Sequence, residues 1–242
     1  MELIAVENLR TSFDGVPVLR GVNLTVGKGS TVVILGTSGA GKSVLLKSII
    51  GLMTPDAGSV RIGGKEIVGM ESQELYAVRR RMGYLFQGAA LYDSMSVRGN
   101  LEFALRRRGP LEEGEMNGRV EEQLRLVGLA DAIDKMPSQL SGGMRKRIGL
   151  ARALITQPEV MLYDEPTTGL DPVTGREISE LIQSLQKKRA ITSIAVTHDI
   201  ACARIIADRV AMLNRGVICF EGALGAMEQA GDEFVKQFFA SA

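Results

Sequence analysis

Apolar and polar residues alternate in three stretches of the N-terminal part of the chain. These stretches, "ELIAVENLRTSF" (2–13), "VPVLRGVNLTV" (16–26) and "GSVRIGGKEI" (58–67), have the period of half-buried antiparallel strands. "STVVILG" (30–36) is instead continuously apolar and rich in β-branched residues, which is typical of a strand covered on both faces. The pattern therefore predicts an antiparallel sheet and one fully buried strand.

The pattern becomes helical at "GKSVLLKSIIGLM" (41–53), where one apolar stripe recurs at helical spacing: Leu45, Leu46, Ile49 and Ile50. The turn "TPDAGS" follows. The region from about Gln87 to Pro158 is mostly helical in pattern. We expect the polar stretch "RRGPLEEGEMNG" (107–118) to interrupt it as a loop.

Two further buried strands are predicted at "EVMLYDE" (159–165) and "TSIAVTH" (192–198), with the helical pattern "GREISELIQSLQKK" (175–188) between them. A strand, a helix and a strand in this order favour a right-handed parallel crossover, and hence an α/β fold. The chain shows no internal repeat and no long linker, so its pieces belong to one unit.

Composition limits the partners of the chain. It has 29 basic and 28 acidic residues and a formal net charge of +1, so no global basic field attracts it to nucleic acid or to an anionic membrane. No apolar run approaches the roughly 18 residues of a spanning helix, and the N-terminus lacks an export signal. We expect a soluble, unexported protein without a nucleic-acid partner, in which Cys202 and Cys219 are packing residues in a reducing compartment.

"GTSGAGKS" (36–43) matches the P-loop pattern and lies between a buried strand and a helix, the context that this pattern requires. Its glycines let backbone N–H groups point into one concavity around phosphate oxygens, while Lys42 adds a mobile cation and Ser43 a magnesium ligand. An ordinary glycine-rich turn is the alternative, which this context disfavours. The predicted nucleotide-binding residues are Gly36, Thr37, Ser38, Gly39, Ala40, Gly41, Lys42, Ser43 and Val44.

Acidic residues and a histidine follow the other two buried strands. Asp164 and Glu165 end "VMLYDE", and His198 ends "TSIAVTH". Ligands of open α/β sheets bind outside the carboxyl ends of the strands, so we expect these groups to gather around the P-loop. Asp164 is then placed to hold Mg²⁺, directly or through water, and Glu165 to orient and deprotonate an attacking water. Taken alone, the Asp-Glu pair is as well explained by a solvated turn, and the histidine by an ordinary structural role.

A second stretch suited to phosphate is "LSGGMRKR" (140–147), in which two glycines open onto a helix. Arg145 and Lys146 lie at the start of that helix, where cations oppose the helix dipole. We expect Lys146 to lie on a solvated face.

Six motifs in this order resemble the ABC transporter ATPase family over nearly the whole chain. They are "GTSGAGKS" (Walker A), "GYLFQ" with Gln87 (Q-loop), "LSGGM" (signature), "VMLYDE" (Walker B with its glutamate), "GLD" with Asp171 (D-loop) and "THD" with His198 (H-loop). The resemblance implies a P-loop NTPase fold with a RecA-like core, an antiparallel β subdomain and a helical signature subdomain. It implies a single ABC ATPase domain over 1–242, with the helical subdomain at about 88–158 and a C-terminal tail at about 221–242.

The resemblance also implies how the P-loop and the signature stretch contact the same ATP molecule. In this family two copies associate head to tail, and each ATP with its Mg²⁺ lies between the Walker A motif of one copy and the signature of the other. Ser141, Gly142 and Gly143 would then meet the γ-phosphate across the interface. The implied catalytic residues are Glu165, His198 and Gln87, the implied metal ligands are Ser43, Gln87 and Asp164, and the further implied nucleotide contacts are Phe13 and Asp171.

Several longer phrases, among them "KMPSQLSGGMRKRIGLARAL" and "LYDEPTTGLDP", are similar to the MlaF-type ATPases of bacterial MCE phospholipid transport systems. This similarity implies an ATP-hydrolysing homodimer that works with an MlaE-like permease and an MCE-domain protein. Such a subunit is cytoplasmic and peripheral on the cytoplasmic face of the inner membrane. Met144, where most signatures have glutamine, agrees with this subgroup but also occurs outside it.

Other readings stay open at this point. The same motor could import a small solute or release lipoproteins, and the chain could be a scaffold that senses ATP without hydrolysing it. Intact Glu165 and His198 count against the scaffold. In the tail, Phe234, Phe238 and Phe239 lie along one helical face, and we expect them to pack against the chain's own domain or the dimer mate.

Overall fold

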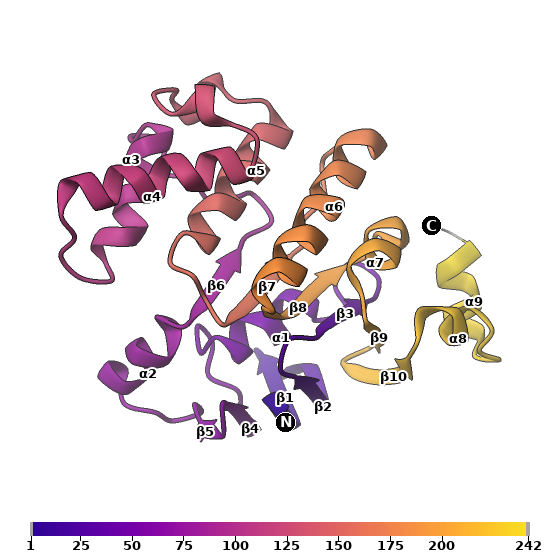
Figure 1. The fold of residues 1–242 in the computed structure, drawn as a ribbon. Coiled ribbons are helices and arrows are strands. Elements are labelled where there is room, and N and C mark those ends of the chain that lie inside the picture. The colour runs from indigo at the N-terminus through magenta and orange to yellow at the C-terminus, as the bar shows by residue number, and fades with distance from the viewer. Residues whose placement is uncertain (1, 241–242) are drawn as a thin grey trace.

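A computed structural model describes residues 2–240 and contains two sheets with helices around them (Figure 1). The first sheet has the strand order β2-β1-β4-β5 and is antiparallel, as the alternating pattern predicts. The alternation in β1 breaks at Asn8, where φ is 47° and the pairing with β2 shifts in register. The strands of this sheet are β1 (Glu2–Phe13), β2 (Val16–Gly27), β4 (Ala57–Ile62) and β5 (Lys65–Glu66).

The second sheet has the order β10-β9-β3-β8-β7-β6, and it is parallel except for β10, which pairs antiparallel with β9. Every residue of β3, β7 and β8 is buried, which confirms the prediction of strands covered on both faces. The carboxyl ends of these parallel neighbours meet at one edge of the sheet. The strands are β3 (Thr31–Leu35), β6 (Met82–Leu85), β7 (Val160–Asp164), β8 (Thr192–Thr197), β9 (Arg209–Asn214) and β10 (Val217–Gly222).

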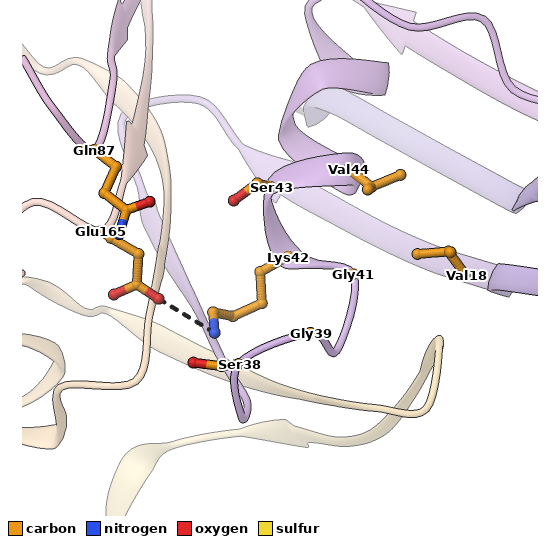
Figure 2. A pocket seen from close by; sticks show the side chains of 9 residues that line it. All are labelled: Val18, Ser38, Gly39, Gly41, Lys42, Ser43, Val44, Gln87 and Glu165. Atoms are coloured by element: carbon orange, nitrogen blue, oxygen red, sulfur yellow. Dashed lines mark ion pairs between the residues drawn. The ribbon is translucent and has the colours of Figure 1, made fainter. Parts of the chain in front are cut away.

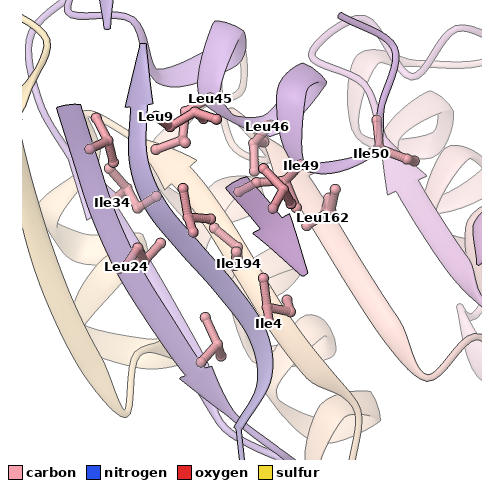
Figure 3. Packing of buried hydrophobic residues seen from close by; sticks show 14 of the residues in the cluster. Ile4, Leu9, Leu24, Ile34, Leu45, Leu46, Ile49, Ile50, Leu162 and Ile194 are labelled. Atoms are coloured by element: carbon pink, nitrogen blue, oxygen red, sulfur yellow. The ribbon is translucent and has the colours of Figure 1, made fainter. Parts of the chain in front are cut away.

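Alternate residues of β3 point into two different hydrophobic cores. Val32 and Ile34 pack into a core that joins both sheets to α1 (Lys42–Ile49), as Figure 3 shows for the larger side chains. The apolar stripe predicted for α1 is buried in this core: Leu45, Leu46, Ile49 and Ile50. Because interiors are close-packed, this core fixes α1, and with it the preceding loop, against the end of β3.

The opposite face of the second sheet is covered by α6 (Pro172–Arg189), α7 (Ile200–Ile206), α8 (Leu224–Glu228) and α9 (Glu233–Ala240). Within α9, Val235 and Phe238 are buried in this core, and Phe234 and Phe239 are packed against it. The described part of the tail thus packs against its own chain, one of the two arrangements expected for it. Residues 241–242 of the predicted tail lie outside the described residues.

A third core holds the helical region together on one side of the molecule (Figure 1). It is formed mainly by α3 (Val97–Arg106), α4 (Glu113–Leu126) and α5 (Gly142–Leu154), with short 3-10 turns at Ala130–Ala132 and Pro137–Gln139. The remaining helix, α2 (Ser72–Arg79), precedes β6. Over residues 2–240, no helix combines the length and the apolar content that crossing a bilayer requires.

Three expectations are wrong. The helix α4 begins at Glu113, inside the stretch expected to be a loop, because Met116, Val120 and Leu124 give that stretch a buried face at helical spacing. Cys202 is buried as predicted, but Cys219 is exposed on β10, the edge strand of its sheet. Lys146, expected on a solvated face, is 5% exposed.

Candidate functional site: the P-loop pocket

The P-loop joins the end of β3 to the start of α1. A Cβ at Gly36 would lie 2.5 Å from the carbonyl oxygen of Leu213 in β9, so the loop can pass this strand closely only with glycine there. Gly41 has a φ of 102° and stands directly before α1, where no side chain caps the helix. The first N–H groups of α1 can therefore face an anion.

The P-loop lines a pocket of about 330 Å³ (Figure 2). Segments that follow three different strands of the parallel sheet meet in it: the P-loop after β3, Gln87 after β6 and Glu165 after β7. Gly36, Thr37 and Ala40 belong to the same loop but lie outside this lining. The lining residues are Val18, Ser38, Gly39, Gly41, Lys42, Ser43, Val44, Gln87 and Glu165.

Lys42 is folded back onto its own loop. Its Nζ donates to the carbonyl oxygen of Gly36 at 2.8 Å and to that of Thr37 at 3.1 Å, and forms an ion pair with Glu165 Oε1 at 3.2 Å. Charges interact more strongly in such a buried place than at the surface. A phosphate that enters the pocket therefore competes with the Glu165 carboxylate for Lys42.

Glu165 is held in one orientation by several donors. His198 Nδ1 lies 2.9 Å from Oε2, and the hydroxyls of Thr168 and Thr197 each donate to the same oxygen at 3.1 Å. Burial favours the neutral acid, but the hydrogen bond from His198 and the charge of Lys42 outweigh it, so the pKa of Glu165 lies below its ordinary value. The residue has a φ of 49°, a left-handed backbone that costs a non-glycine residue on the order of 1 kcal/mol.

Asp164 and Ser43 form the part of the site suited to a cation. Ser43 Oγ donates to Asp164 Oδ1 at 2.8 Å, so two oxygen ligands already converge there. Mg²⁺ commonly binds one or two carboxylates together with substrate phosphates, and this donor set fits that need. The described residues contain no cluster of three or more acidic, histidine or cysteine side chains that would suggest a different, all-protein metal site.

Tyr84, on β6, lies inside the "GYLFQ" motif, but the motif assigns a role only to Gln87. The Tyr84 hydroxyl donates to Asp164 Oδ2 at 3.0 Å. Burial, the charge of Asp164 and this hydrogen bond raise the pKa of Tyr84, so the hydroxyl stays protonated and acts as a donor. Asp164 is therefore oriented from both sides, by Ser43 and by Tyr84.

The signature residues lie away from the P-loop pocket of their own chain. Within residues 2–240, Ser141, Gly142 and Gly143 are absent from the pocket lining. Ser141 Oγ accepts from the Met144 N–H at 3.2 Å and so caps α5. Ser141 and Gly142 are exposed, which leaves this helix start accessible to another molecule.

Two further predicted contacts also lie outside the lining of this pocket. Asp171 caps α6, because its carboxylate accepts from the N–H groups of Val173 at 3.1 Å and Thr174 at 3.0 Å. Phe13 ends β1 and is 45% exposed. Contacts of either residue with nucleotide stay predictions.

Lys146 is the second residue that sequence reasoning missed. It is buried on α5, and its Nζ donates to the carbonyl oxygens of Gln87 and, at 2.9 Å, of Glu165. The helical spacing of its neighbours indicates a buried position. Gly149, Leu150 and Ala153 follow Lys146 by three, four and seven residues, and all of them are buried. Lys146 therefore belongs to the buried face of α5 by position, despite its charge.

A P-loop between a buried strand and a helix, with acidic residues at the end of a neighbouring parallel strand, defines a P-loop nucleotide-binding protein. The model of the ABC transporter family matches residues 19–168, and the chain belongs to this family.

Sequence matches to related proteins cover most of this chain. It is 42% identical over 235 residues to the probable ribonucleotide transport ATP-binding protein mkl of Mycobacterium bovis, a match that covers 97% of this chain and 66% of the relative. It is 39% identical over 221 residues to the methionine import ATP-binding protein MetN of Rhizobium etli, covering 91% of this chain and 61% of the relative. The chain thus spans less than two thirds of the length of these relatives.

Solved structures of similar cassettes confirm the expected fold. The dimeric post-hydrolysis structure of the ATP-binding cassette MJ0796 with ADP and Pi has a TM-score of 0.85 at 32% identity, and the match covers 91% of this chain and 98% of that chain. The structure of cbiO1 from Clostridium perfringens, part of the ABC transporter complex cbiONQ, has a TM-score of 0.83 at 31% identity, covering 99% and 91%.

Proposed function

We propose that this chain is the ATP-binding and ATP-hydrolysing subunit of an ABC transporter. The observation that supports this most directly is the meeting of Lys42 and Glu165 in the P-loop pocket, 3.2 Å apart (Figure 2). One is a cation suited to phosphate, and the other is a carboxylate suited to activating a water. The test is a steady-state ATPase assay of the purified chain and of its complex with a permease. ATP binding without turnover in both would favour the sensing scaffold instead.

The proposed mechanism begins when the phosphates of ATP enter the pocket. Backbone N–H groups of the P-loop and of the first turn of α1 donate to the phosphate oxygens, and Lys42 leaves its loop carbonyls to join them. Mg²⁺, when bound, neutralises phosphate charge, and Ser43, Asp164 and Gln87 are the residues that would hold it. Tyr84 keeps the Asp164 carboxylate oriented during this step.

Glu165 then acts on the attacking water. Once Lys42 has turned away, Glu165 keeps its hydrogen bond to His198, and Oε1 can accept a proton from water. Loss of the Lys42 charge also raises the pKa of Glu165 from its lowered value, which makes the carboxylate a stronger base. The proton passes to Oε1 as the water oxygen bonds to the γ-phosphorus and the bond to the ADP oxygen breaks.

We further propose that two copies of the chain complete each site. The exposed start of α5, with Ser141, Gly142 and Gly143, presents N–H groups and a helix N-terminus that suit a phosphate. Because these residues lie outside the pocket of their own chain, the phosphate they meet belongs to the ATP of the second copy. Hydrolysis removes the γ-phosphate that both copies hold, and the dimer opens.

Lys42→Ala is expected to weaken ATP binding by about 10- to 100-fold, because hydrogen bonds to charged groups contribute roughly 1.5–3 kcal/mol. The measurement is an equilibrium titration with a fluorescent ATP analogue. Lys47→Ala, in the last turn of the same helix, is the matched control and should bind as the wild type does. Wild-type affinity in the Lys42 variant would contradict the proposed role.

We propose phospholipid as the cargo, with an MlaE-like permease and an MCE-domain protein as partners at the cytoplasmic face of the inner membrane. The support is the similarity of the signature region, including Met144, to MlaF-type ATPases. Two relatives are named for other cargo, ribonucleotides for mkl and methionine for MetN. This chain is 42% identical to the one and 39% identical to the other, so identity does not distinguish between these cargoes.

The cargo is tested by co-purifying the chain with its permease from membranes and reconstituting the complex in vesicles. Lipid analysis of the purified complex and ATPase assays with added phospholipid, ribonucleotide or methionine follow. We expect bound phospholipid and stimulation by phospholipid. Stimulation by ribonucleotide or methionine alone would contradict a lipid cargo.

A further inference from the structure

Lys146 is a buried lysine whose hydrogen bonds go to two residues of the proposed catalytic site. It lies on α5, five residues after Ser141, and its side chain crosses to the ends of two neighbouring parallel strands. There its Nζ donates to the carbonyl oxygen of Gln87, after β6, and to that of Glu165, after β7. One ammonium group therefore joins the backbone of both residues to the signature helix.

The position of Lys146 is unfavourable for a lysine on general grounds. Burial lowers the pKa of Lys146, although the carboxylates of Glu165 and Asp164 oppose that shift. Burying the ammonium group of Lys146 costs free energy relative to leaving it in water. Its hydrogen bonds to the two carbonyl oxygens offset this cost.

The same helix holds the backbone next to Gln87 through a second cation. Arg152 donates to the carbonyl oxygens of Ala89 at 2.9 Å and Ala90 at 2.7 Å. Ala89, Ala90 and Glu165 all have positive φ, at 61°, 49° and 49°. Non-glycine residues keep a backbone conformation with positive φ only when the surrounding structure holds them in it. The two cations of α5 thus donate to backbone with positive φ at Glu165 and at Ala89 and Ala90, two and three residues after Gln87.

We propose that Lys146 is a positioning residue that couples the signature end of α5 to Gln87 and Glu165 of the same chain. In a dimer that closes over two ATP molecules, Ser141 and Gly142 grip the ATP of one site. The rise of 1.5 Å per residue along a rigid helix places Lys146 about 7 Å from them, so a shift of α5 moves the Lys146 ammonium with it. The ammonium group in turn positions the backbone carbonyls of Gln87 and Glu165, which belong to the second site, formed by the P-loop of the same chain as Lys146.

The consequence is cooperativity between the two sites. ATP bound in one site orders Gln87 and Glu165 in the second site, although neither of these residues contacts the ATP of the first site. This inference rests on the proposed function, because it assumes hydrolysis in two shared sites. Beyond that function, the inference assigns a role to Lys146 and gives the coupling a direction, from the signature of a chain to Glu165 of the same chain.

The test compares Lys146→Met with Lys146→Gln in the full-length chain. Methionine fills the volume without donors, and we expect kcat to fall by about 10- to 100-fold with the Hill coefficient for ATP moving toward unity. The affinity of the isolated chain for ATP should stay close to wild type, since Lys146 does not line the pocket. Glutamine, whose carboxamide donates two hydrogen bonds, should recover part of both losses. Lys135→Met, an exposed lysine of the same helical region, is the matched control.

Hydrogen exchange gives a readout that does not depend on turnover. ATP should protect the amides of residues 86–90 in the wild type and in Lys146→Gln, but not in Lys146→Met. Wild-type cooperativity and ATP-induced protection in Lys146→Met would overturn the proposal. If Lys146→Met fails to fold, Lys146→Gln decides: wild-type kcat and Hill coefficient without ATP-induced protection of residues 86–90 would overturn it, because the coupling would then not pass through the backbone that Lys146 holds. Absence of turnover in the wild type would instead contradict the proposed function.

Discussion

Glu165→Gln is expected to lower the ATP turnover rate by about 10²- to 10⁴-fold while ATP stays bound. Glutamine has the shape of glutamate, and its amide oxygen can still accept from His198 and Thr197, so the local backbone is kept. It cannot take a proton from water. It also ends the 3.2 Å ion pair with Lys42, which leaves the lysine available to phosphate before ATP arrives.

The variant should therefore accumulate as an ATP-bound dimer, which size-exclusion chromatography with and without ATP measures alongside turnover. Glu159→Gln is the matched control, because it makes the same chemical change just before β7 at an exposed carboxylate paired with Arg81. An exposed ion pair contributes little to stability, so this control should turn over like the wild type. Normal turnover in the Glu165 variant would refute its role as the general base.

Gly142→Asp is expected to abolish ATP-dependent dimerisation and to lower turnover by ~100-fold or more, as the loss of a single stabilising donor does in other active sites. The new carboxylate would face the γ-phosphate of the second copy. Two like charges about 4 Å apart repel by roughly 4 kcal/mol at an effective dielectric constant of 20. Within its own chain the change is well tolerated, because Gly142 is exposed and a Cβ there meets Leu170 at an ordinary 3.6 Å.

ATP binding by the isolated Gly142→Asp chain should equal that of the wild type, which distinguishes this variant from Lys42→Ala. Combining the change with Glu165→Gln gives the sharpest assay, because the ATP-trapped dimer of the single Glu165 variant should then be lost. Gly114→Asp, an exposed glycine in the first turn of α4, is the matched control and should dimerise normally. A Gly142→Asp chain that dimerises and turns over normally would show that the signature does not contact ATP.

Local patterns were sufficient for the parts of the site that lie at strand ends. The continuously apolar β3 and the glycines after it predicted the P-loop, and the carboxyl-end rule predicted that Glu165 gathers beside Lys42, as it does at 3.2 Å. The structure likewise places His198 next to Glu165, at 2.9 Å. Gln87 is indicated only by the family resemblance, because the strand β6 before it has 4 residues, too few for the hydrophobic pattern to indicate a strand.

The sequence by itself determined the periods of the strands and helices, the turn chemistry of the P-loop and the order of the motifs, because these depend on residues close together along the chain. Only the tertiary structure decided the partners of Tyr84 and Lys146. Tyr84 donates to a carboxylate 80 residues away, and Lys146 to carbonyls 59 and 19 residues away. Such pairs depend on how helices pack against a sheet. A buried lysine needs polar partners for its ammonium group, and for Lys146 only packing brings the two carbonyl oxygens into place.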